Sequence, residues 1–130
     1  MNKEVLEKYA VRAPSNDDFD DLMDDENSRN YRAYRIYSTK DREIYIDVRD
    51  KNGDGRLVSY NYIKQVQYVS HTLVSIIGTD FVITLEGRNL RGIIKGIHDE
   101  QIRYVQEFNS TRFDMPEDGK AVIEKITITE

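Results

Sequence analysis

The amino-acid sequence predicts an α+β fold, in which a mostly antiparallel, twisted or partly closed sheet carries one packed helix. Several short stretches alternate apolar and polar residues, which is the period of a half-buried strand. Residues 89–99 instead repeat their apolar side chains with the period of a helix face. The length of 130 residues suits a single domain. We therefore expect about six to eight strands and one helix within residues 31–130.

The first 30 residues are predicted to form a flexible acidic leader. They hold nine acidic and four basic side chains and so carry the whole net charge of -5, whereas residues 31–130 hold fifteen of each. The carboxylates between Asp17 and Glu26 repel one another in a compact state. The alternative is a short amphipathic helix that docks in a groove on a partner or on its own domain. The candidate partner-binding residues of that helix are Phe19, Leu22 and Met23, spaced i, i+3, i+4.

Four stretches after the leader have the composition of strands. They are Tyr31–Ser38, Glu43–Arg49, Arg56–Tyr62 and Ile63–Gln67. The pattern is clearest in Glu43–Arg49, where every second residue is apolar and β-branched. In Arg56–Tyr62, the residues Val58, Tyr60 and Tyr62 alternate with polar positions. Ile63–Gln67 fits a helical turn as well as a continued strand.

The most apolar stretch, Leu73–Ile97, is predicted to hold the centre of the fold. Residues 73–77 and 81–85 are β-branched runs on either side of Gly78-Thr79-Asp80, which predicts a β-hairpin. The side chains expected to face inward from its second strand are Phe81, Ile83 and Leu85.

A helix is predicted from Asn89 to about Asp99. Its apolar stripe is Leu90, Ile93, Ile94 and Ile97, and Asn89 stands before it as the N-cap. Gly92 and Gly96 oppose this helix by about 1 kcal/mol each relative to Ala. As a strand, the stretch would mix apolar and basic residues on one face, so the strand alternative explains less of the pattern. Two strands are expected to follow, Ile102–Phe108 and Lys120–Thr129.

The loop from Asp50 to Gly55 resembles the start of an EF-hand calcium loop, D-x-N-x-D-G. Oxygen ligands at alternate positions converge on a cation when glycine permits the sharp turn, so the candidate metal ligands are Asp50, Asn52 and Asp54. The twelfth position is Asn61, which cannot supply a bidentate carboxylate, and the flanking residues alternate as strands do. A polar hairpin loop is therefore the preferred interpretation.

A second candidate site lies at the start of the predicted helix. Arg88 and Arg91 flank this end and Lys95 follows one turn later. A helix start offers unpaired N–H groups and a positive dipole end, which together attract an anion or a phosphate. The preferred alternative is that these cations form the solvated side of an amphipathic helix.

Composition argues against catalysis and membrane insertion. The chain has no cysteine, which is typical of a reducing compartment. Its two histidines, His71 and His98, belong to no metal-spaced or catalytic cluster. No apolar segment approaches the ~20 residues of a membrane-spanning helix, and no secretory signal is visible. We expect a cytoplasmic, non-enzymatic protein that uses no cofactor and no membrane, and whose nine tyrosines serve packing.

Two families resemble parts of the chain. Residues 56–128, through ITLEGRNL, resemble a short bacterial domain of uncharacterised function. In that domain two strands, an EGRNL-type turn and a helix are followed by a strand that pairs back. The stretch FVITLEGRNLRGIIKGI is also similar to the first motif of Sm-like RNA-binding proteins, which implies a strand at Arg91-Gly92 and RNA binding. The Asp-Asn nucleotide pocket of that family has no counterpart after the second strand here.

These observations favour an interaction or adaptor module that binds an unidentified protein partner. Nucleic acid is a less favoured partner because residues 31–130 are neutral overall. The alternatives are an Sm-like RNA-binding protein and a calcium-binding domain. The sequence leaves a homo-oligomer open.

Overall fold

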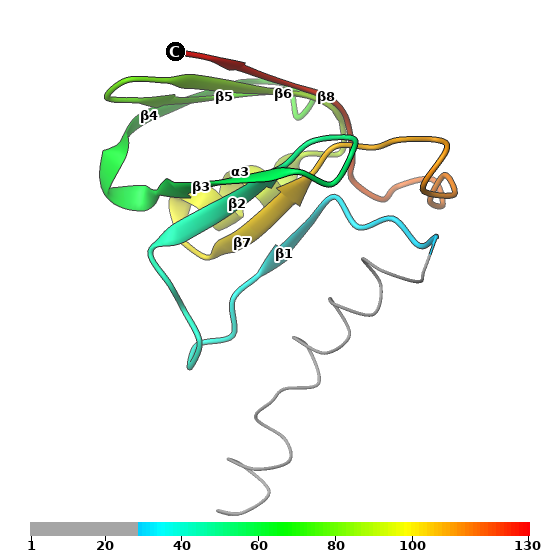
Figure 1. Ribbon diagram of the computed structural model, residues 1–130, viewed down its shortest axis with the longest axis horizontal. Coiled ribbons are helices and arrows are strands. Elements are labelled where there is room, and N and C mark those ends of the chain that lie inside the picture. The colour runs from blue at the N-terminus through cyan, green and yellow to red at the C-terminus, as the bar shows by residue number, and fades with distance from the viewer. Residues whose placement is uncertain (1–28) are drawn as a thin grey trace, which may run out of the picture. The chain divides into compact units, whose positions relative to one another are not determined.

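The computed structural model describes residues 29–130, and Tyr31–Glu130 form one compact unit (Figure 1). The described residues contain eight strands, one α-helix and one short 3-10 helix. In chain order these are β1 Tyr34–Ile36, β2 Tyr45–Arg49, β3 Gly55–Ser59, η2 Tyr60–Tyr62, β4 Ile63–Val69, β5 Leu73–Gly78, β6 Val82–Arg88, α3 Arg91–His98, β7 Ile102–Gln106 and β8 Val122–Thr129.

The strands form two four-stranded sheets, with the orders β1-β7-β2-β3 and β4-β5-β6-β8. Five of the six strand pairs are antiparallel, and only β2 and β7 run parallel within residues 29–130. The predicted α+β class with a mostly antiparallel sheet is therefore confirmed. Local alternation did not reveal that the strands divide between two layers. In Figure 1 the chain crosses from one layer to the other at η2, between β3 and β4.

The β5–β6 hairpin is present as predicted and carries the centre of the core. Val74 and Ile76 of β5 pair with Leu85 and Ile83 of β6, and all four side chains are buried. Phe81 precedes β6 by one residue, and its half-buried side chain packs against the core, so it faces inward as predicted. Its ring lies over Gly78, where a Cβ would come within 2.1 Å of it.

The predicted helix is α3, and its apolar stripe faces the core. Leu90, Ile93 and Ile97 are buried and Ile94 is partly buried. The predicted N-cap is wrong: Leu90 occupies that position and makes no side-chain capping bond. Asn89 instead has a left-handed backbone, with φ of 58°, and its Nδ2 donates to the Lys120 carbonyl at 3.0 Å. Asparagine tolerates this conformation better than most residues.

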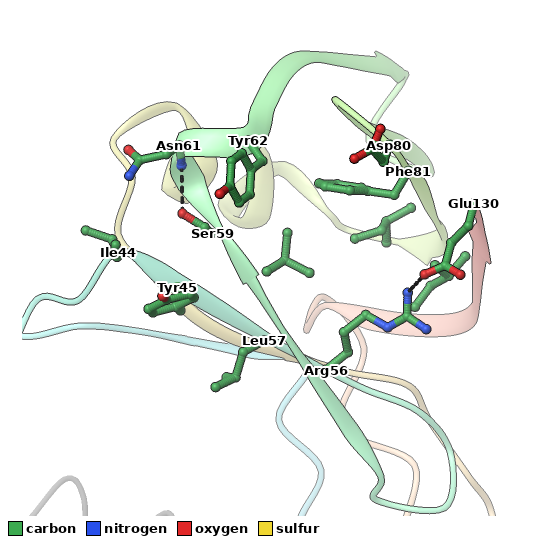
Figure 2. A pocket seen from close by; sticks show the side chains of 13 residues that line it. Ile44, Tyr45, Arg56, Leu57, Ser59, Asn61, Tyr62, Asp80, Phe81 and Glu130 are labelled. Atoms are coloured by element: carbon green, nitrogen blue, oxygen red, sulfur yellow. Dashed lines mark hydrogen bonds and ion pairs between the residues drawn. The ribbon is translucent and has the colours of Figure 1, made fainter.

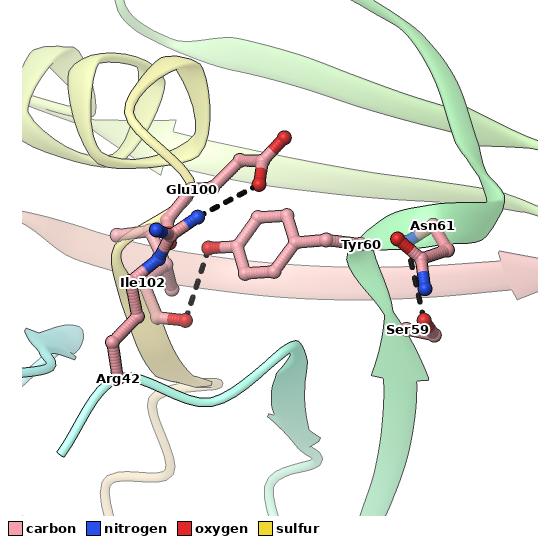
Figure 3. A network of polar contacts seen from close by, with 6 residues as sticks. All are labelled: Arg42, Ser59, Tyr60, Asn61, Glu100 and Ile102. Carbon is pink, nitrogen blue, oxygen red and sulfur yellow. Dashed lines mark hydrogen bonds and ion pairs between the residues drawn. The ribbon is translucent and has the colours of Figure 1, made fainter.

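The ambiguous stretch after residue 62 is the strand β4, and η2 carries the chain to it from β3. Figure 3 shows the contacts that fix this crossing. The Tyr60 hydroxyl donates to the Ile102 carbonyl at 3.0 Å, and the Ser59 hydroxyl accepts from the Asn61 N–H at 3.1 Å. Nearby, Arg42 and Glu100 form an exposed ion pair at 2.8 Å. The crossing is thereby held at the start of β7.

The predicted leader, including Phe19, Leu22 and Met23, falls almost entirely outside the described residues, so its flexibility and its role stay predictions. Among the helices of residues 29–130, none is long and apolar enough to cross a bilayer.

Candidate protein-interaction surface

A hollow of about 390 Å³ opens between β3 and the facing part of the second sheet. Its floor is apolar and contains Val58 from β3, Ile83 from β6 and Ile128 from β8. Figure 2 shows Tyr62, Asp80 and Phe81 on one side of it and Arg56 with Glu130 on another. We call this hollow, defined by these eight residues, the inter-sheet groove. Its volume is at the lower end of the ~300–1,000 Å³ typical of ligand sites.

Large apolar side chains are exposed around this groove. Tyr62 is 60% exposed, and Leu57 on β3, which also lines the hollow, is 66% exposed (Figure 2). Ile44 and Tyr45, at the start of β2, are exposed beside them. Scattered apolar residues are ordinary on a protein surface, but clustering at a concave, apolar-floored site is typical of an interaction surface.

Local structure explains why Tyr62 is exposed although it was predicted to alternate with Val58 and Tyr60. Val58 and Tyr60 are buried, and the 3-10 turn that begins at Tyr60 breaks the two-residue period before Tyr62. The Tyr62 carbonyl then accepts a hydrogen bond from the Thr79 N–H at 3.0 Å, which ties the turn to the hairpin tip. Sequence alternation could not locate Tyr62 because the period changes within three residues.

Charge at the rim of the groove is unevenly compensated. Arg56 and Glu130 form an ion pair at 2.5 Å that links β3 to the end of β8. Both side chains are about half-exposed or more, so this pair adds little stability. Asp80 is exposed and has no ion-pair partner in the described part of the chain. The rim thus carries one negative charge that no described cation pairs with.

A second, smaller hollow of about 310 Å³ lies between α3 and β4. Ile63 and Val66 line it from β4, and Ile94 and Ile97 from α3. Among the described residues, this hollow has one strongly exposed large apolar side chain, Tyr68, which is 57% exposed. The inter-sheet groove has four such residues and is the stronger candidate.

The predicted metal ligands lie in the β2–β3 loop. Asp50 Oδ1 accepts hydrogen bonds from the N–H groups of Asn52 at 2.9 Å and Asp54 at 3.0 Å, so this oxygen stabilises the turn. Gly53 has φ of 90°, which glycine adopts readily. No group of three or more acidic or histidine side chains suited to a metal occurs among residues 29–130. These contacts support the hairpin-loop interpretation.

The predicted anion-binding residues are not joined by any described contact. The Arg88 guanidinium donates to Met115 Sδ at 3.1 Å, and Lys95 pairs with Asp99 at 2.7 Å on the exposed side of α3. The hydrogen bond from Lys95, followed by that from His98, lowers the pKa of the Asp99 carboxyl. Arg91 is exposed at the first position of the helix. Lys95 is thus already paired within its helix, as the solvated-face interpretation expects.

The two family resemblances compare differently with the observed topology. The strand that an Sm-like motif implies at Arg91-Gly92 is the helix α3. In the other resemblance a strand after the helix pairs back, and β8 pairs with β6 in this way, whereas β7 joins β1 and β2 in the other sheet. Comparison with family models, curated proteins and solved structures finds no match for this chain.

Proposed function

We propose that this protein is a non-enzymatic interaction module that binds a segment of a protein partner in the inter-sheet groove. The observation that carries the proposal is the gathering of exposed apolar side chains, Tyr62 and Leu57 foremost, around a concave site with an apolar floor. Burying apolar area is the main driving force of protein association, and aromatic residues at concave sites dominate binding energies.

Selection from a library of displayed random linear peptides, with the full-length protein as target, tests this proposal. A selected peptide is then labelled, and its affinity is measured by fluorescence anisotropy. We expect Tyr62→Ala to weaken binding by about tenfold or more, as truncation of an aromatic anchor does.

Tyr68→Ala is the matched control, because Tyr68 is almost equally exposed but lies beside the other hollow. It should leave the affinity of the peptide within about twofold, a change too small for a hot spot. Loss of binding in Tyr68→Ala and not in Tyr62→Ala would move the site to the α3–β4 hollow and refute the proposal. Failure to enrich any peptide on the wild-type protein would refute it as well.

A further inference from the structure

We infer that the partner segment binds as an added β-strand, pairing its backbone with the free edge of β3 while apolar side chains enter the inter-sheet groove. This inference rests on the proposed function and adds the conformation and the chemistry of the ligand. Strand addition to an open sheet edge gives affinity through backbone hydrogen bonds and specificity through alternate side chains.

The hydrogen-bond register identifies which backbone groups of β3 are free. The Tyr60 N–H donates to the Ile44 carbonyl and the Asp50 N–H to the Asp54 carbonyl, in register with the pairs Ile46–Val58 and Val48–Arg56. Even-numbered residues of β3 therefore bond to β2. In an antiparallel pair the intervening residues direct their N–H and C=O groups away. Those residues are Gly55, Leu57 and Ser59, and no backbone hydrogen bond to another segment is described for them. Ser59 is buried, so the accessible part of this edge is Gly55 and Leu57.

The edge of β3 lacks the features that block pairing at other edges. Natural edge strands are protected by charged residues, by bulges or by being very short. The register of β4 is irregular after Ile63 and the strand carries Lys64, β8 exposes Glu124 and Lys125, and β1 has three residues. The pairing of β3 with β2 is regular, and its one charged residue, Arg56, is in an ion pair with Glu130. β3 is thus an edge that is open to pairing at Gly55 and Leu57.

Exposed apolar side chains lie next to this edge. Leu57 and Tyr45 are exposed at the hollow, beside the buried Val58 and the half-buried Phe81. Because Leu57 and Val58 are neighbours in β3, their side chains point to opposite faces of the sheet, and one added strand contacts both. An extended segment along β3 therefore covers more of these side chains than a ligand confined to one face does.

The rim of the groove indicates the chemistry of that segment. Residues that point into the groove meet Val58, Phe81 and Ile128 and should be apolar. Asp80 adds a negative charge without an ion-pair partner, so a lysine or arginine in the segment is favoured.

Backbone N-methylation of the selected peptide, one residue at a time, tests strand addition. Each methyl group removes one N–H donor and blocks close approach of the two backbones. We expect affinity to fall by about tenfold or more at every second position and to change little between them, since only alternate N–H groups face β3. Sensitivity at all positions, or at none, would refute strand addition. If Tyr62→Ala still weakened binding in that case, the proposed binding in the groove would stand without strand addition.

Charge recognition is tested by Asp80→Asn, with Asp118→Asn as the control that removes the same charge from an exposed loop. Selected peptides should carry lysine or arginine, and Asp80→Asn should weaken their binding by about fivefold, with no change in Asp118→Asn. Equal affinities for both variants would refute the role of Asp80.

Sedimentation of the full-length protein provides a further check. A dimer that disappears in Leu57→Pro would show that a second copy occupies the edge and would overturn the inference.

Discussion

Two buried tyrosines connect segments that lie far apart in the sequence. The Tyr31 hydroxyl donates to the Gln106 carbonyl at 2.6 Å and accepts from the Ile123 N–H at 2.9 Å. Its ring packs edge-on against Phe108 and Phe113. Tyr60 makes the corresponding contact with Ile102 across the η2 crossing. The sequence predicted tyrosines that serve packing, but which of them are buried depends on carbonyl partners that are distant in the chain.

Tyr60→Phe should destabilise the protein by about 1–3 kcal/mol. The substitution keeps the ring but leaves the buried Ile102 carbonyl without its donor, and an unpaired buried polar group costs about this much. Urea denaturation at neutral pH measures the free energy of unfolding. Tyr62→Phe is the control, because that tyrosine is mostly exposed and has no described hydroxyl bond. Equal losses in the two variants would contradict the role assigned to Tyr60.

The effect of Tyr60→Phe should shrink at alkaline pH. Burial raises the pKa of the Tyr60 phenol well above its usual value of 10.0. A raised pKa in the folded state contributes stability that is fully present below the unfolded value and is lost as pH rises above it. Urea titrations at about pH 8 and about pH 11 should therefore bring wild type and variant closer together at the higher pH. A constant difference would contradict this linkage.

At the scale of elements, α3 shows where sequence rules and packing disagree. Gly92 and Gly96 weaken the helix by propensity, yet they let it pack closely against β1 and β7. A Cβ at Gly96 would lie 2.4 Å from Ile102 Cδ1, and one at Gly92 would lie 1.9 Å from the Tyr34 hydroxyl. The apolar stripe predicted the helix correctly, but the reason for its glycines is a tertiary contact that no local pattern reveals.

Gly96→Ala and Gly92→Ala should therefore change the stability of the protein by different amounts or in opposite directions. Ile102 is fully buried and has little room to move, so the added methyl at residue 96 should cost about 1–3 kcal/mol by overpacking. The Tyr34 hydroxyl is the end of a partly exposed side chain that can swing aside, so Gly92→Ala should gain part of the ~1 kcal/mol of helix propensity. Thermal denaturation of both variants measures the difference. Similar destabilisation in both would show that Tyr34 is as rigid as Ile102.

At the scale of the whole molecule, periodicity predicted the elements better than their partners. The alternation in residues 43–49 and the helical stripe after residue 89 correspond to β2 and α3. The parallel pairing of β2 with β7 joins segments more than fifty residues apart, and neither carries a signal of the other. The inter-sheet groove depends on such pairings, because its residues come from β3, from the hairpin and from β8. For that reason, no residue of the groove was among the predicted site residues.

The boundary between leader and domain is a prediction that deletion can test. The buried apolar residues that the structure describes all lie between Tyr31 and Ile123, and the acidic leader offers few apolar residues to a core. Removing residues 1–28 should therefore shift the thermal midpoint by little. Removing residues 1–33 instead takes away Tyr31 and its hydrogen bonds to Gln106 and Ile123, and should lower the midpoint by about 10 °C or more. A loss of several degrees in the shorter deletion would contradict the boundary and favour docking of Phe19, Leu22 and Met23 on the domain.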